Sequence, residues 1–331
     1  MSVSSAPRAL EDILSSAGSV EEELLSASHR DTVARLQRLG PLLGEALDWA
    51  AENDPERGLA LAAALWRYWA ASGALLEGRQ QLRWLLSLVP VLSQTRLRGL
   101  TSSAVLTAVD GETLLAATLA REAMPLARAL EDESRLAFLE LVEGWGDEAQ
   151  GDAHGAGRSF ESALERFRDG QHRWGTATTL LGLGNVARAL SDARASALYS
   201  EALALFELLG DAAGVSSSHA KLGLAALAAG ATRDAEHHLE KAVAPDPGEQ
   251  DVSALACALL GQCALERFAG RPETAARLLG QSQRVLEGRG AALLPVDRSL
   301  AEREEAELRR MLGPRYEAEW RRGQKPGPAD A

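Results

Sequence analysis

The chain has 331 residues, of which 46% are hydrophobic and 25% charged, a composition typical of folded proteins and not of disordered ones. Ala and Leu dominate and β-branched residues are sparse, which favours helices over sheets. The net charge of −12, with no basic patch in the sequence, excludes nucleic acid as an expected partner.

Residues 1–30 form an N-terminal segment that matches no repeat pattern. Within it, PRALEDILSSA (7–17) is amphipathic and predicts a capping helix. Residues 31–288 are predicted to form a helical repeat array, followed by capping helices over 289–323 and a disordered tail over 324–331. In the C-terminal capping helices, the run AEREEAELRR from Ala301 predicts a solvated helix face.

The stretch GLALAAALWRYWAASGALLEGRQQLRWLL (58–86) places Trp66, Trp69 and Trp84 among alanines. Charges such as Arg67 interrupt it, so it is too short to span a membrane, and we expect no membrane partner. Trp66 and Trp69 share one helical stripe, which favours the core of a helix pair. An aromatic box that holds a ligand is the minor alternative.

Short turns with a small residue recur along the chain at intervals of 38 to 40 residues. They are centred on Gly73, Gly111, Gly151, Ser191, Gly230 and Gly270. Each turn lies between helical patterns of about 15 residues. The spacing predicts helix pairs, whose first and second members we call helix A and helix B.

Residues around these turns resemble the tetratricopeptide repeat (TPR). The segment KLGLAALAAGATRDAEHHLEKAVAPDP places small residues and a proline at the expected offsets, namely Gly223, Ala235, Ala242 and Pro247. The segment EGWGDEAQGDAHGAGRSFESAL does the same with Gly144, Ala156, Phe160 and Ala163. The resemblance implies an all-α, right-handed superhelix of stacked antiparallel helix pairs, a TPR-like solenoid of about six units of 38–40 residues.

Both ends of the array carry a second resemblance. LWRYW with EGR and Trp84, and the closing segment AARLLGQSQRVLEGRGAALLP, resemble the repeat region of bacterial AfsR-like and LuxR-type (MalT-like) signal-transduction ATPases. The chain lacks a Gly-Lys dipeptide, so it has no Walker A motif, and it lacks the basic charge of a helix-turn-helix module. The resemblance therefore implies a regulator-like bacterial repeat region without ATPase and DNA-binding domains, or a remnant of a larger regulator.

No metal or cofactor motif is present in the sequence. Cys257 and Cys263 are six residues apart and point in different directions on a helix, so no disulfide is expected between them and a cytoplasmic location is the default. There is no His-Glu-x-x-His or Cys-x-x-Cys motif, and His237 and His238 are expected to be a solvated pair. We predict no metal and no cofactor.

Candidate binding residues lie on helix A, which lines the concave groove in repeats of this kind. Counting from each packing glycine gives the inward positions Arg67, Trp145, Glu148, Asn185, Arg188, Gln262 and Glu266. A lining of aromatic, amide and charged groups suits a peptide or a polar small molecule. The alternative is that these residues are merely solvated on an unoccupied groove.

Two functional hypotheses follow. The first is a non-enzymatic, monomeric TPR scaffold or sensor that binds a partner protein, a peptide or a small effector in its groove, with a regulatory role. The second is an enzyme, for example a cyclase or rearrangement catalyst of a biosynthetic pathway, built on a recruited TPR groove. Glu148, Glu266 and Arg188 would then supply acid–base help.

Overall fold

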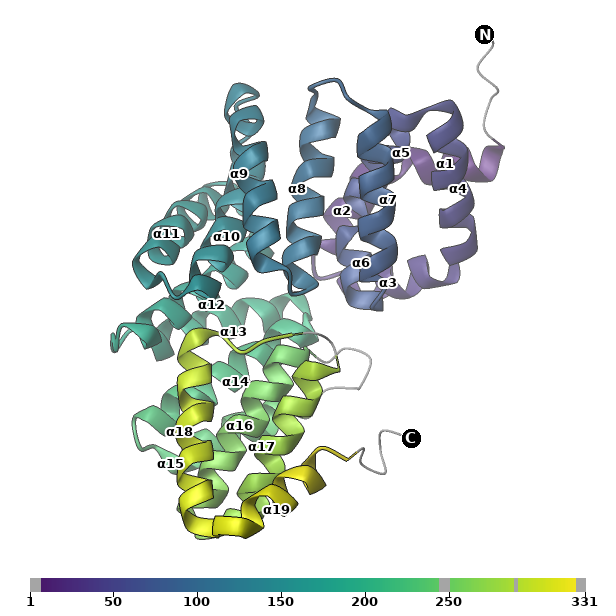
Figure 1. Cartoon of the computed structure of the whole chain (residues 1–331). Helices are drawn as coiled ribbons and strands as arrows, with labels where there is room; N and C mark the ends of the chain where they lie inside the picture. Colours follow the sequence, from purple (N-terminus) through teal and green to yellow (C-terminus); the bar gives the residue numbers. More distant parts are fainter. Residues whose placement is uncertain (1–6, 244–250, 289–290, 326–331) are drawn as a thin grey trace. The chain divides into compact units, whose positions relative to one another are not determined.

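The computed structural model describes residues 7–243, 251–288 and 291–325, and the secondary structure in these ranges is entirely helical (Figure 1). The helices pack sequentially in pairs, so the all-α solenoid predicted from the sequence is confirmed. None of the described helices is long and apolar enough to cross a membrane. The expected tail, apart from 324 and 325, lies outside the described residues, as does the interrepeat segment APDPGE (244–249).

The chain divides into two compact units. Unit 1 comprises Met1–Asp147, Gly155–Thr179 and Leu208–Asp211, and unit 2 comprises Glu148–His154, Leu180–Glu207 and Ala212–Ala331. The division does not follow single helices, because α10 (Glu133–Gln150) and α12 (Arg173–Ala189) contribute residues to both units. Each unit is described separately below.

Unit 1 begins with short helices and continues with longer helix pairs. Its helices are α1 (Arg8–Ser15), α2 (Ala17–Leu24), α3 (His29–Arg38), α4 (Gly40–Asn53), α5 (Pro55–Ala64), α6 (Trp66–Ser72), α7 (Leu75–Leu88), α8 (Gln94–Val109), α9 (Thr113–Ala129), most of α10, and α11 (Ala153–Asp169). The amphipathic segment near the N-terminus forms α1, which buries Leu10, Ile13 and Leu14. Its role as a cap stays a prediction.

Unit 2 contains the end of α12, most of the helix that follows it, the last two repeat pairs and the C-terminal helices. Its elements are α13 (Ala195–Leu209), α14 (Ala212–Ala228), α15 (Thr232–Val243), α16 (Val252–Phe268), α17 (Pro272–Glu287), α18 (Pro295–Leu312), a 3-10 turn (Gly313–Arg315) and α19 (Tyr316–Gly323). α14 packs on α15 and α16, and α16 packs on α17. α18 returns along α16 and α17 (Figure 1).

The repeated turns all adopt the left-handed backbone conformation that ends a helix. The residues at their centres have positive φ at Gly73 (74°), Gly111 (91°), Gly151 (82°), Ser191 (57°), Gly230 (73°) and Gly270 (74°). Glycine adopts this conformation without a steric penalty, whereas Ser191 meets one. The turn positions predicted from the sequence are therefore confirmed.

Close approach of helix A and helix B explains the small residues inside the helices. A Cβ on Gly223 of α14 would lie 2.6 Å from the Leu239 side chain of α15. A Cβ on Gly144 of α10 would overlap the Phe160 ring of α11. Both large side chains are fully buried, so each fills the space that the glycine leaves.

Part of the tryptophan-rich stretch lies in the hydrophobic core. Trp66 and Trp69 are each 2% exposed, and the Trp66 ring meets the Trp174 ring edge-on at 5.2 Å between centroids. Trp69 lies against α7, where a Cβ on Gly78 would come within 2.5 Å of the indole. Trp84 is 42% exposed, so the prediction was wrong for this ring, because α7 turns Gly78, Leu82 and Leu85 inward instead.

Candidate functional site

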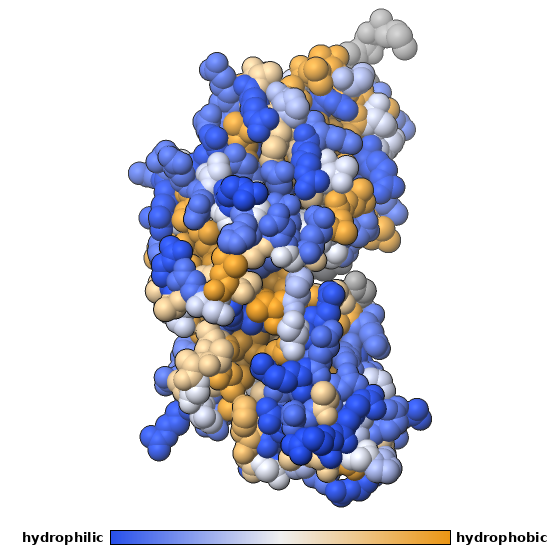
Figure 2. Space-filling view, turned by 60° about the vertical axis from the view of Figure 1, so that its left-hand side comes forward, coloured by the Kyte–Doolittle hydropathy of each residue, from blue (hydrophilic) through white to orange (hydrophobic). Residues whose placement is uncertain are grey.

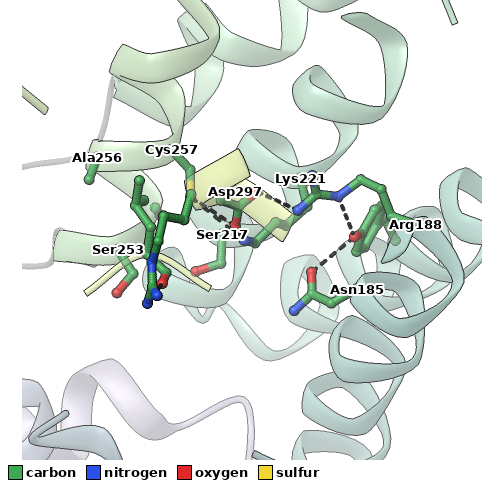
Figure 3. Close-up of polar contacts among 12 residues, drawn as sticks. Asn185, Arg188, Ser217, Lys221, Ser253, Ala256, Cys257 and Asp297 are labelled. Carbon is green, nitrogen blue, oxygen red and sulfur yellow. Dashed lines mark hydrogen bonds and ion pairs between the residues drawn. The ribbon is translucent and has the colours of Figure 1, made fainter. Parts of the chain in front are cut away.

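A buried carboxylate stands at the centre of a polar cluster in unit 2. Asp297, in the first turn of α18, is 0% exposed. Its Oδ2 accepts a hydrogen bond from Lys221 Nζ at 2.7 Å, and its Oδ1 accepts one from the Arg188 guanidinium. The thiol of Cys257 lies 3.6 Å from Oδ2 (Figure 3). Two cations and a thiol thus surround one acid.

Successive helices A supply the groups around this acid. We define the Asp297 cluster as Glu148 of α10, Asn185 and Arg188 of α12, Tyr199 of α13, Lys221 of α14, Cys257 of α16 and Asp297 of α18. Hydrogen bonds bring residues of successive helices A together around Asp297. All seven residues belong to unit 2.

A packing glycine orients the arginine of the cluster. A Cβ on Gly184 would overlap the Tyr199 ring, so the ring lies directly on α12. The Tyr199 hydroxyl donates to Asn185 Oδ1 at 2.9 Å and accepts from Arg188 Nε at 3.4 Å. These contacts leave the terminal nitrogen of Arg188 directed at Asp297 (Figure 3).

The cluster keeps its central groups charged despite burial. Burial opposes ionisation of Asp297, but the charges of Lys221 and Arg188 outweigh this effect and lower the pKa of the carboxyl. For Lys221, burial favours the neutral amine, yet the Asp297 carboxylate raises its pKa above the usual value. The carboxylate raises the pKa of Arg188 in the same way. At neutral pH Asp297, Lys221 and Arg188 are therefore all charged.

Glu148 differs from Asp297 because one of its oxygens is enclosed without a partner. Its Oε1 has no hydrogen-bond partner and no solvent exposure. Burial raises the pKa of this carboxyl to about 7, although the charge of Lys221 and a hydrogen bond from Asn185 oppose the rise. Glu148 is therefore a carboxyl that changes its protonation near neutral pH.

Cys257 is not poised as a nucleophile. Burial, reinforced by the Asp297 charge, raises the pKa of its thiol to about 12, so the thiol stays protonated at neutral pH. Cys257 and Cys263 are both free, as the spacing predicted. In this cluster the thiol serves as a weak hydrogen-bond donor to Asp297.

The other predicted groove residues lie outside the cluster. Arg67 is buried in unit 1, where it pairs with Asp211 at 2.7 Å. Trp145 is half-buried on α10, also in unit 1, and Gln262 is half-buried on α16. Glu266 of α16 accepts hydrogen bonds from Arg271 at 2.5 and 2.8 Å, and this pairing lowers its pKa.

Four members of the cluster were missed at the level of sequence, namely Tyr199, Lys221, Cys257 and Asp297. A sequence feature could have indicated Lys221. Apart from a histidine, it is the single acidic or basic residue of α14, whose sequence is AAGVSSSHAKLGLAALA. No sequence feature indicates Asp297, because it follows the repeats and lies 76 residues from Lys221 and 109 from Arg188.

A second ion pair joins α18 to the repeats. Glu304 is 1% exposed and accepts from Arg267 of α16 at 2.5 and 2.9 Å. The prediction that AEREEAELRR is a solvated face was therefore wrong for Glu304, which lies seven residues after Asp297 and so on the same face of the helix. The sequence pattern shows charge but not which face is covered.

The histidines form a pair that differs from the expected one. His219 is buried, and its Nδ1 lies 2.9 Å from Nδ1 of His238, so His238 is not simply solvated. Burial lowers the pKa of His219 to about 4, so this ring is neutral at physiological pH. Within the described ranges no three His, Cys, Asp or Glu side chains are grouped to hold a metal ion.

Comparisons with known proteins find solved structures that are similar to this chain. No family model matches the chain, and no curated protein matches it. The crystal structure of BtubC (BKLC) from P. vanneervenii is similar, with 21% identity and a TM-score of 0.48, over 66% of this chain and 91% of that one. The apo form of RapI is similar with 13% identity and a TM-score of 0.47, over 92% and 87%. These values assign no family, so the AfsR-like and LuxR-type resemblance stays a prediction.

Proposed function

We propose that this protein is a non-enzymatic helical-repeat scaffold that binds an acidic group of a partner protein or effector on the helix-A side of unit 2. One observation carries the proposal: Arg188 and Lys221, from successive repeats, meet on a single buried carboxylate. A regulatory role is part of this proposal.

The chemistry of the cluster favours a carboxylate as the recognised group. The Arg188 and Lys221 side chains are only 11% and 12% exposed, and two such cations cost free energy unless an anion neutralises them. Arg188 and Lys221 approach different oxygens of Asp297, so they fit a group with two acceptor oxygens. Tyr199 and Asn185 fix the arginine beforehand, which reduces the entropy lost on binding.

Chemical rescue tests the proposal directly. Asp297→Ala leaves Arg188 and Lys221 without their anion, and we expect the melting temperature to fall by several degrees, because breaking a buried pair costs about 3–5 kcal/mol. Acetate should fill the vacated position and raise the melting temperature saturably. Sodium chloride at equal ionic strength should not.

Two variants control this rescue experiment. Glu302→Ala removes a carboxylate from the exposed side of α18 and should show no specific response to acetate. Asp297→Ala combined with Lys221→Met removes one cation, should recover part of the stability and should lose the acetate response. Equal effects of acetate and chloride on Asp297→Ala would refute carboxylate binding by the cluster.

A second candidate function, acid–base catalysis, has one observation in its favour. Glu148 combines a pKa of about 7 with an unpartnered Oε1, the properties of a general acid or base. The test is turnover of a panel of carboxylic acids, followed by NMR, with wild-type protein and Glu148→Gln. Turnover lost in the variant would favour the enzyme, and no turnover by wild type would reject it for that panel.

A further inference from the structure

The inner face of α18 carries a regular stripe of acidic and apolar residues. Asp297, Glu304, Leu308 and Leu312 are its buried positions, and Leu300 is half-buried between the two acids. The intervals of 3, 4 and 4 residues from Asp297 to Leu308 keep the stripe on one side of the helix. The opposite side, with Arg298, Glu302 and Arg303, is exposed.

Each position of the stripe has a complementary partner on the repeats. Asp297 meets Arg188 and Lys221, and Glu304 meets Arg267. Leu300 packs against the apolar cluster that contains Ala220 and Leu224, and Leu308 belongs to the cluster of Leu260 and Leu279. α18 therefore docks as an amphipathic helix docks in a groove, with acids and leucines as its anchors.

The two halves of α18 are held by different forces. The first half docks chiefly through Asp297 and Glu304, and buried ion pairs contribute little net stability because desolvation offsets their attraction. The second half buries Leu308 and Leu312 and leads through buried Tyr316 into α19, whose backbone lies directly on α17 at Gly280. Exchange of the first half costs little if another acid takes its place.

We infer that the first half of α18, residues 295–304, is an internal pseudo-ligand that occupies the recognition groove of unit 2. A partner protein displaces it with an amphipathic helix of the same pattern: an acid, an apolar residue three positions later and an acid seven positions later. The second half of α18 and α19 stay in place during this exchange. The inference rests on the proposed function and names its partner class.

A peptide with the sequence of residues 291–304 is the probe for this exchange. We expect it to bind the full-length chain and to increase amide hydrogen exchange at residues 295–304 of the chain, with residues 308–323 unchanged. A 15N-labelled chain separates these fragments by mass from those of the unlabelled peptide. A fluorescent form of the peptide should bind the Asp297→Asn chain about tenfold tighter than wild type, because the internal competitor is weakened.

Matched peptides test whether the stripe carries the binding. A peptide with Asp297→Asn loses one anchoring acid and should bind at least about tenfold more weakly. A peptide with Glu302→Gln loses the same charge from an exposed position outside the stripe and should bind like the original. Equal loss in both peptides would overturn the inference.

The outcomes separate this inference from the proposed function. If acetate rescues Asp297→Ala but the peptide leaves exchange at residues 295–304 of the wild-type chain unchanged, α18 is a fixed part of unit 2 and the inference is wrong. If acetate fails, the carboxylate site itself is rejected. The wild-type exchange measurement stands even where Asp297→Asn fails to fold.

Discussion

At the residue scale, Glu148 and Asp297 show how one cluster gives two carboxyl groups opposite properties. Asp297 contacts both cations and stays ionised, whereas Glu148 keeps an oxygen enclosed without a partner, and its pKa rises to about 7. The difference comes from hydrogen bonding and charge contact, since both carboxyls experience burial. Glu148 is therefore the group in this cluster that titrates near neutrality.

The raised pKa of Glu148 predicts a pH-dependent stability. The folded state binds this proton more tightly than the unfolded chain, where the pKa is near 4.5. The stabilising contribution is complete below that value and is lost as pH rises through 7. The free energy of unfolding of wild type should fall by up to about 3 kcal/mol relative to Glu148→Gln between pH 4.5 and 8.

Urea denaturation at a series of pH values measures this effect. Lys221, Arg188 and Asp297 face Glu148 and keep their charges over this range, so they do not produce the same slope. Glu122→Gln, an exposed change on α9, is the control and should follow wild type. If the free energy of unfolding depended on pH in the same way for Glu148→Gln and wild type, the raised pKa of Glu148 would be contradicted.

At the scale of the elements, glycines in helices have two different roles. Gly184 of α12 lies under the Tyr199 ring, whereas a Cβ on Gly44 of α4 would meet nothing within 4 Å. The first is required by packing between helix A and helix B. The second only weakens its helix, because glycine loses more backbone entropy than alanine on folding.

The same substitution at these two glycines should therefore have opposite effects. Gly184→Ala forces the Tyr199 ring away from α12 and should destabilise the protein by about 1–3 kcal/mol. Gly44→Ala should stabilise it by about 0.5–1 kcal/mol. Thermal unfolding of both variants checks the prediction, and destabilisation of both would show that open space at Gly44 is not available to a methyl group.

At the scale of the whole molecule, a segment outside the regular repeats supplies a buried acid in each unit. In unit 2 the acid is Asp297 of α18. In unit 1 it is Glu21 of α2, which is 7% exposed and pairs with Arg135 at 2.7 Å and Arg98 at 3.2 Å. The surface remains predominantly hydrophilic on the face shown in Figure 2, in keeping with the net charge of −12.

Removing the acid in unit 1 should have a stability cost of its own. Glu21→Gln leaves buried Arg135 without its anion, and we expect a loss of about 3 kcal/mol in the free energy of unfolding. Glu22→Gln, at the exposed neighbouring position, should change stability little. Equal values for the two variants in urea denaturation would mean that the Glu21 pair contributes no net stability.

The sequence by itself determined the helix pairs, the turn positions and the packing of Gly144 and Gly223 against large residues. These features depend on local periodicity and on residues within one repeat, which a single chain displays directly. It also placed Glu148, Asn185 and Arg188 on one face by their distance from packing glycines. The predicted interior position of Trp84 failed because periodicity does not show which neighbour covers a helix face.

Only the tertiary structure decided what those face residues meet. Asp297 reaches Arg188 and Lys221 across 109 and 76 residues of sequence because α18 folds back along α16 and α17. No local sequence pattern predicts that α18 folds back along these helices. The sequence also does not show whether a charged residue is solvated or buried. The partner of a buried charge is set by the three-dimensional path of the chain, and here that path places an acid of α18 between two cations of the repeats.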